Sequence, residues 1–258
     1  MMHSDVLIVG AGPTGLVLAL WLTKLGVKVR ILDKTAEPGT TSRALAVQAR
    51  TLELYRQLDL AEAVVKHGHK VPAVNLWVKG EPAARLPFEK IGSDLTPAFL
   101  QIFPQDQHER LLIERLEALG VSVERRTELV SFTDDGERVV ACLRGPEGQA
   151  ETCEASYIAG CDGARSTVRA TIGAGFPGGT YRHLFYVADV EAVGRALDGE
   201  LHVDLDEADF LAVFPLAGNG RARLIGTVRD ERADDADKLK FNDVSDRTIH
   251  NQRFMCRQ

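Results

Sequence analysis

The sequence predicts an α/β fold in which a parallel sheet and an antiparallel sheet belong to separate domains. Apolar residues 6–9 end at a glycine-rich turn and are followed by the apolar segment 16–22, which is typical of a strand packed against a helix. Short strand-like runs in residues 121–143, with an Asp-Asp-Gly turn among them, predict a β-meander. Strand-like runs return in residues 71–99 and 181–228, and they predict the antiparallel layer.

A glycine motif joins the first strand to the first helix. It reads Gly10-Ala11-Gly12-Pro13-Thr14-Gly15. Gly10 permits a sharp turn, Gly12 lets the backbone approach a pyrophosphate at the helix N-terminus, and Gly15 brings the helix close to the strand. The motif therefore predicts a phosphate-binding turn.

A second strand and an acidic residue complete the unit. Gly26 ends the helix, residues 27–32 form the next strand, and Asp33 follows at the point where a carboxylate would meet the hydroxyls of a ribose. A G-x-G-x-x-G motif alone is often only a glycine-rich turn, but here strand, helix, second strand and acid occur in order. We therefore predict a Rossmann-like dinucleotide-binding site.

The other elements follow from periodicity. Residues 42–60 carry apolar residues at helical spacing, and residues 107–119 predict an amphipathic helix that ends at Gly120. The strands of the meander are expected at residues 121–124, 128–132 and 138–143.

Composition indicates an ordinary globular protein. The 258 residues carry a formal net charge of -6 and no basic run, so we expect no nucleic-acid partner. Four cysteines lack C-x-x-C or metal-ligand spacing, which favours reduced thiols, a cytoplasmic location and no metal site. The apolar segment 16–22 is too short to span a membrane and lacks a basic flank, so we expect no membrane association.

A second motif follows residues 156–159, which read as a buried strand. Asp162 and Gly163 come soon after it, and such a pair alone is a common turn. Here the motif is longer than the pair, because it continues through residues 166–169. With the βαβ unit and the meander, this ordered set resembles the flavoprotein aromatic hydroxylases, the single-component FAD monooxygenases related to p-hydroxybenzoate hydroxylase and to the phenol and polyketide hydroxylases.

The resemblance implies a set of cofactor-binding residues. The glycine motif would hold the pyrophosphate of FAD, and Asp33 would hold the adenosine ribose with Lys34 beside it. The further implied positions are Arg43, Gln105, Val130, Asp162 and Gly163. Simpler interpretations stay open, because an arginine at a helix start is commonly solvated, a glutamine there can cap the helix, and a valine in a meander can be plain core.

The activity that the resemblance implies is hydroxylation of a small aromatic or polyketide-like substrate. NAD(P)H would reduce FAD, and one oxygen atom of O2 would be transferred to an activated ring. No catalytic residue is assigned, and the sequence names neither the substrate, nor the choice between NADH and NADPH, nor the oligomeric state.

The carboxyl-terminal part departs from the family pattern. The family has a third FAD motif built on a Gly-Asp pair, and this sequence contains no Gly-Asp dipeptide. We therefore expect a truncated and impaired enzyme, with a non-catalytic FAD- or ADP-binding remnant as the alternative. A short-chain dehydrogenase is disfavoured because no tyrosine is followed by lysine four residues later.

These observations predict a division of the chain into three parts. We expect a discontinuous FAD-binding domain over residues 1–70 and 101–175, a substrate-binding sheet domain over residues 71–100 and 176–230, and an atypical tail over residues 231–258.

Overall fold

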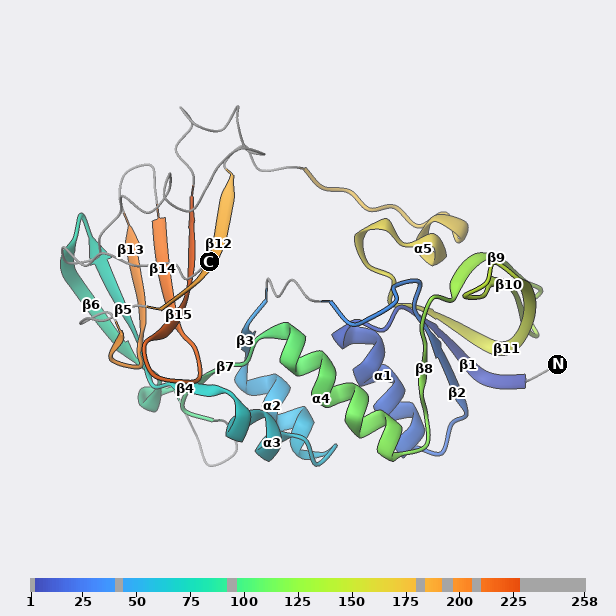
Figure 1. Ribbon diagram of the computed structural model, residues 1–258, viewed down its shortest axis with the longest axis horizontal. Helices are drawn as coiled ribbons and strands as arrows, with labels where there is room; N and C mark the ends of the chain where they lie inside the picture. Colours follow the sequence, from blue (N-terminus) through green and yellow to red (C-terminus); the bar gives the residue numbers. More distant parts are fainter. Residues whose placement is uncertain are drawn as a thin grey trace. The chain divides into compact units, whose positions relative to one another are not determined.

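The computed structural model of the chain describes residues 3–39, 44–91, 97–179, 184–191, 197–205 and 210–227. The chain divides into two compact units, one from residues 1–42 and 105–178 and the other from residues 43–104 and 179–258. Each unit contains its own six-stranded sheet (Figure 1).

The sheet of the first unit has the strand order β8-β2-β1-β11-β10-β9. Its strands are β1 (His3–Val9), β2 (Val29–Leu32), β8 (Val123–Glu124), β9 (Glu128–Asp134), β10 (Val139–Arg144) and β11 (Ala150–Gly160). Strand β1 runs parallel to both β2 and β11, whereas β9, β10 and β11 pair antiparallel. The predicted βαβ unit is therefore confirmed, and so is the presence of a β-meander.

Two helices pack against each other in this unit (Figure 1). Helix α1 (Pro13–Lys24) connects β1 to β2, and helix α4 (Gln105–Ala118) leads to β8. Leu112 and Leu116 of α4 lie one helical turn apart and are fully buried, as the amphipathic pattern predicts. After β11 come a short 3-10 helix (Gly163–Arg165) and helix α5 (Thr167–Thr171).

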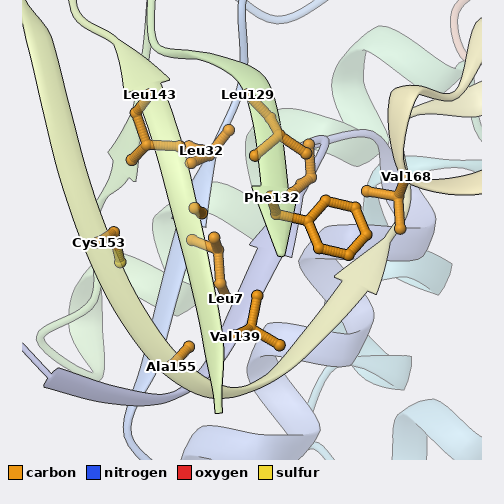
Figure 2. Packing of buried hydrophobic residues seen from close by; sticks show 11 residues of the cluster. Leu7, Leu32, Leu129, Phe132, Val139, Leu143, Cys153, Ala155 and Val168 are labelled. Carbon is orange, nitrogen blue, oxygen red and sulfur yellow. The ribbon is translucent and has the colours of Figure 1, made fainter. Parts of the chain in front are cut away.

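A hydrophobic core of the first unit lies between the parallel strands and the meander (Figure 2). Leu7 of β1 and Leu32 of β2 pack with Leu129 and Phe132 of β9, and Val168 of α5 closes one end of the cluster. This core fixes the meander over the carboxyl ends of the parallel strands, because the same apolar cluster contains residues from both.

The meander differs from the predicted one in its strands. Residues 121–124 were expected to open it, but β8 pairs parallel with β2 instead, with Val123 opposite Ile31. The third meander strand is β11, whose eleven residues pair with β10 at one end and with β1 at the other. Short apolar runs do not specify their partner strand, which long-range packing decides.

The second unit contains two sheets. The larger has the order β12-β15-β14-β13-β5-β6, and the smaller the order β3-β7-β4. The strands of the larger sheet are β5 (Ala73–Val78), β6 (Glu81–Pro87), β12 (Phe185–Glu191), β13 (Leu201–Leu205), β14 (Phe210–Pro215) and β15 (Arg221–Thr227). Those of the smaller are β3 (Ala46–Val47), β4 (His69–Val71) and β7 (Leu100–Ile102).

The antiparallel layer expected from the sequence is present, with one exception. Strand β13 runs parallel to β5, so that the two separate stretches of chain in this unit join at this pair. All other pairs recorded in this sheet are antiparallel.

The limits of the two compact units lie at other positions of the chain than the expected domain limits. The stretch 42–60, in which apolar residues occur at helical spacing, contains strand β3 and helix α2 (Ala49–Arg56), and helix α3 (Ala61–His67) begins directly after the stretch. Both helices belong to the second unit, where α3 contacts β4. Periodicity identifies such helices but not the sheet they pack against. No helix among the described residues is long and apolar enough to cross a membrane.

Candidate functional site

The glycine motif lies where three parallel strands of the first unit end. The Gly10 N–H donates to the Leu32 carbonyl at 2.8 Å, and the Cys161 N–H donates to the Val9 carbonyl at 2.7 Å. These bonds tie the ends of β1, β2 and β11 together at one edge. The carboxyl ends of parallel strands are the usual place for a ligand in such sheets.

Gly10 and Gly15 are required by the packing of the protein itself. Gly10 has a φ of +103°, and a Cβ there would lie 2.3 Å from the Cys161 carbonyl oxygen. A Cβ on Gly15 would lie 1.9 Å from the Gly10 carbonyl oxygen. Any side chain at either position would therefore force α1 or β11 away from the turn.

Gly12 is different, because neither backbone conformation nor packing requires a glycine there. Its φ of -74° and ψ of 179° suit any residue, and a Cβ would have no atom of the described residues beyond its chain neighbours within 4 Å. Gly12 is the N-cap of α1, where no side chain caps the helix, and Pro13 occupies the first turn. The open space beside Gly12 lies at the positive end of a helix whose first turn contains no acidic residue, which suits an anion.

Asp33 lies at the end of β2 and faces the glycine motif. Its Oδ2 accepts a hydrogen bond from the Ala11 N–H at 2.8 Å, and its Oδ1 accepts from the Thr35 N–H at 2.8 Å and the Thr35 hydroxyl at 2.7 Å. Burial pushes the pKa of Asp33 upward, but these bonds and the charge of Arg125 outweigh it, so the pKa lies below its ordinary value. Asp33 is therefore an ionised acceptor at neutral pH.

A cavity of about 260 Å³ opens at this edge of the sheet. Of the residues named from sequence, Gly10, Asp33, Lys34, Asp162 and Gly163 line it. The structure adds Val9, Leu32, Thr35, Thr127, Glu128, Leu129, Cys161, Arg165 and Thr167. The sequence could have identified the lining residues that end or follow β1, β2 and β11, because their position after a strand is visible in it. Thr127, Glu128 and Leu129 line the cavity only because of the way the meander folds.

The Asp162 carboxylate is engaged by the protein. It accepts a hydrogen bond from the Ser166 hydroxyl and from the backbone N–H groups of Thr167 at 2.6 Å and Val168 at 3.3 Å. Gly163 has a φ of +76°, which glycine adopts without strain. Asp162 therefore shapes the cavity wall by holding the turn and the start of α5.

Of three further residues implied by the resemblance, two lie elsewhere and the third cannot be placed among the described residues. Val130 on edge strand β9 is 47% exposed and does not line the cavity. Gln105 begins α4 and donates to the Glu109 carboxylate at 2.8 Å, and it does not line the cavity either. Arg43 lies outside the described residues. Their cofactor roles stay predictions.

The chain matches a known family model and several known proteins. The family model for the FAD binding domain matches residues 3–252. A protein named 6-methylpretetramide 4-monooxygenase from Streptomyces rimosus is 41% identical over 169 residues, covering 66% of this chain and 30% of that protein. A flavin-dependent monooxygenase from Mycobacteroides abscessus is 36% identical over 239 residues, covering 88% of this chain and 50% of that protein.

Solved structures agree with these matches. A ternary complex of aklavinone-11 hydroxylase with FAD and aklavinone has a TM-score of 0.76 and 25% identity, and the alignment covers 99% of this chain and 53% of that one. The chain thus spans about half, or less, of the length of these relatives. Because the family model covers nearly the whole sequence and the fold agrees, the resemblance drawn from the motifs is confirmed, and the chain belongs to the FAD-binding domain family.

Proposed function

We propose that this chain supplies the FAD-binding part of a monooxygenase that hydroxylates an aromatic or polyketide-like substrate with NAD(P)H and O2. The observation that carries the proposal is the cavity beside Asp33 together with the unfilled space at Gly12. The names of the relatives, which include 6-methylpretetramide and aklavinone hydroxylating enzymes, support a fused-ring polyketide substrate.

The residues present fit FAD. Packing among the described residues requires no glycine at position 12, so the space there is explained by a pyrophosphate in contact with the backbone. The cavity of about 260 Å³ is smaller than the range of about 300–1,000 Å³ typical of pockets for whole ligands, so it accounts for one part of the cofactor. Its position at Asp33 points to the adenosine ribose.

The chain contributes binding and orientation. The N–H groups of the first turn of α1 have no partners within the helix and would face the pyrophosphate, while the ionised Asp33 would accept from ribose hydroxyls. When bound, FAD supplies the redox chemistry and the activation of oxygen. The Cys161 thiol takes no part as a nucleophile in this proposal, since burial and the Asp162 charge raise its pKa.

The two units divide this work in the proposal. The first unit, with the glycine motif and Asp33, binds FAD, and the larger sheet of the second unit contributes to binding of the substrate. We also propose a cytoplasmic location, and this proposal rests only on the cysteine pattern.

The test begins with the visible spectrum of the purified chain after incubation with FAD and removal of free cofactor. Flavin bands in near-stoichiometric amount support the binding site, whereas a colourless protein contradicts it. Incubation with NADH or NADPH and a panel of phenols and fused-ring polyketides then measures hydroxylated product and hydrogen peroxide together. Bound FAD without product from any substrate favours the non-catalytic FAD-binding alternative. Gly12→Val serves as the matched control, because it changes the cofactor space and not the protein's own packing.

A further inference from the structure

The Thr35 hydroxyl lies between two acceptors at the rim of the cavity. Its oxygen is 2.7 Å from Asp33 Oδ1 and 3.0 Å from the Glu37 carbonyl oxygen. A threonine hydroxyl carries a single proton, so it donates to one of these acceptors at a time. Rotation of the hydroxyl therefore decides whether Asp33 or Glu37 receives the hydrogen bond.

The oxygen of this hydroxyl is held from the other side by Arg125. Nη1 of Arg125 donates to Thr35 Oγ1 at 3.3 Å, and Nη2 is buried without a hydrogen-bond partner among the described residues. The backbone around this threonine is also hydrogen-bonded. The Arg126 N–H donates to the Thr35 carbonyl at 3.1 Å, and the Thr127 N–H donates to the Asp33 carbonyl at 3.0 Å. These contacts place the oxygen within reach of both acceptors, so the proton can change direction without movement of the side chain.

The Asp33 carboxylate has too few vacant acceptor positions for a ribose diol. A carboxylate offers about four lone-pair sites, two on each oxygen. Oδ1 already accepts from the Thr35 N–H and the Thr35 hydroxyl, and Oδ2 accepts from the Ala11 N–H. One site is left, whereas the two hydroxyls of a ribose bring two donors. The two backbone donors cannot turn away, but the Thr35 hydroxyl can, because Glu37 offers it another acceptor.

We propose that Thr35 is a specificity-determining residue for the ribose, whose hydroxyl proton turns from Asp33 to the Glu37 carbonyl when a vicinal diol binds. The inference rests on the proposed FAD site. Turning the proton exchanges a bond to the charged Asp33 for one to a neutral carbonyl, and only ligands with ribose hydroxyls incur this cost. A ligand without these hydroxyls leaves the Thr35–Asp33 bond intact. Thr35 therefore reduces the preference for a diol below the value that Asp33 alone would give.

The experiment compares two probes, ADP and 2′,3′-dideoxyadenosine diphosphate, by calorimetry on the full chain. The measured quantity is the ratio of the dideoxy-ADP dissociation constant to the ADP dissociation constant. Thr35→Val keeps the shape of the side chain and removes the hydroxyl. We expect it to raise the ratio roughly fivefold above wild type, since a charged acceptor makes a bond about twice as strong as a neutral one.

Three further variants separate this role from a structural one. Thr35→Ser keeps the hydroxyl and should keep the wild-type ratio, and Thr35→Ala provides a second removal if the valine variant does not fold. Thr133→Val, on an exposed position of β9, controls for the same substitution elsewhere in the unit. Because each variant is judged by a ratio of two ligands, a general loss of stability cancels.

The outcomes are distinct. A ratio that is unchanged or lower in Thr35→Val overturns the inference, and a lower ratio would show that the hydroxyl bonds the ribose directly. A ratio of one in both wild type and Thr35→Val also overturns it, while displacement of ADP by FAD would leave the proposed site standing. Wild-type protein that binds neither ADP nor FAD contradicts the proposed function as well.

Discussion

Replacing Gly12 with valine is expected to abolish FAD binding and leave the first unit folded. The backbone at Gly12 has an ordinary φ of -74°, and in the part of the chain that the structure describes an added Cβ meets no atom beyond its chain neighbours within 4 Å. In a compatible conformation, replacing glycine stabilises a protein by about 0.4–1 kcal/mol through the unfolded chain. Gly12 is also the N-cap of α1, where valine is less favourable than glycine, so this gain is offset. The melting temperature should therefore stay close to that of wild type.

The matched comparison is Gly15→Ala, three residues away in the same motif. Its Cβ would lie 1.9 Å from the Gly10 carbonyl oxygen, so α1 must move away from β1. Overpacking of this kind costs about 1–3 kcal/mol or more, and here a backbone atom stands in the way. Gly15→Ala should thus lower both the melting temperature and FAD affinity, whereas Gly12→Val should lower only the affinity.

The assay is FAD binding by quenching of flavin fluorescence, measured beside thermal melting followed by circular dichroism. We expect at least about a 100-fold loss of affinity in Gly12→Val, equivalent to about 2.7 kcal/mol. Wild-type affinity in this variant would show that the space beside Gly12 does not receive the cofactor. A strongly lowered melting temperature would show that Gly12 has a packing role after all.

Three further predictions concern charged groups of the first unit. Asp33→Ala should weaken FAD binding about 10- to 100-fold in calorimetry, because hydrogen bonds to a charged group contribute about 1.5–3 kcal/mol, and an unchanged dissociation constant would exclude the ribose contact. Burial lowers the pKa of His108 from 6.5 to about 4. Between these two pH values the unfolded chain therefore binds more protons than the folded chain. The free energy of unfolding should fall by about 3 kcal/mol as the pH falls from 6.5 to 4. His108→Leu should lose that pH dependence in urea titrations, and a slope equal to wild type would contradict the assignment. Arg30 is buried between Glu124 and Glu151, and its replacement by methionine removes both ion pairs. The substitution should lower the free energy of unfolding in urea by about 1–3 kcal/mol, and no more, because both carboxylates are partly exposed and regain water. An unchanged midpoint would show that the pairs contribute nothing.

Local pattern in the sequence was sufficient for four elements of the first unit. Apolar runs, glycines and helical spacing predicted β1, α1, β2 and α4, because each of these signals lies within one element or at its end. Asp33 could be named for the same reason, since it follows a strand in a motif of fixed spacing. The FAD cofactor followed from the order of the motifs and is shown by the family match.

Tertiary structure alone decided which strands pair and which residues reach the cavity. The partners of β8 and β11, and the parallel pairing of β13 with β5, depend on contacts between distant segments, which no local pattern encodes. Thr127 joins the cavity because the meander folds back over the ends of the parallel strands. The engagement of Asp162 with α5, and of Thr35 with Arg125, likewise required side-chain positions, since hydrogen-bond partners are set by distance in space and not by separation in the chain.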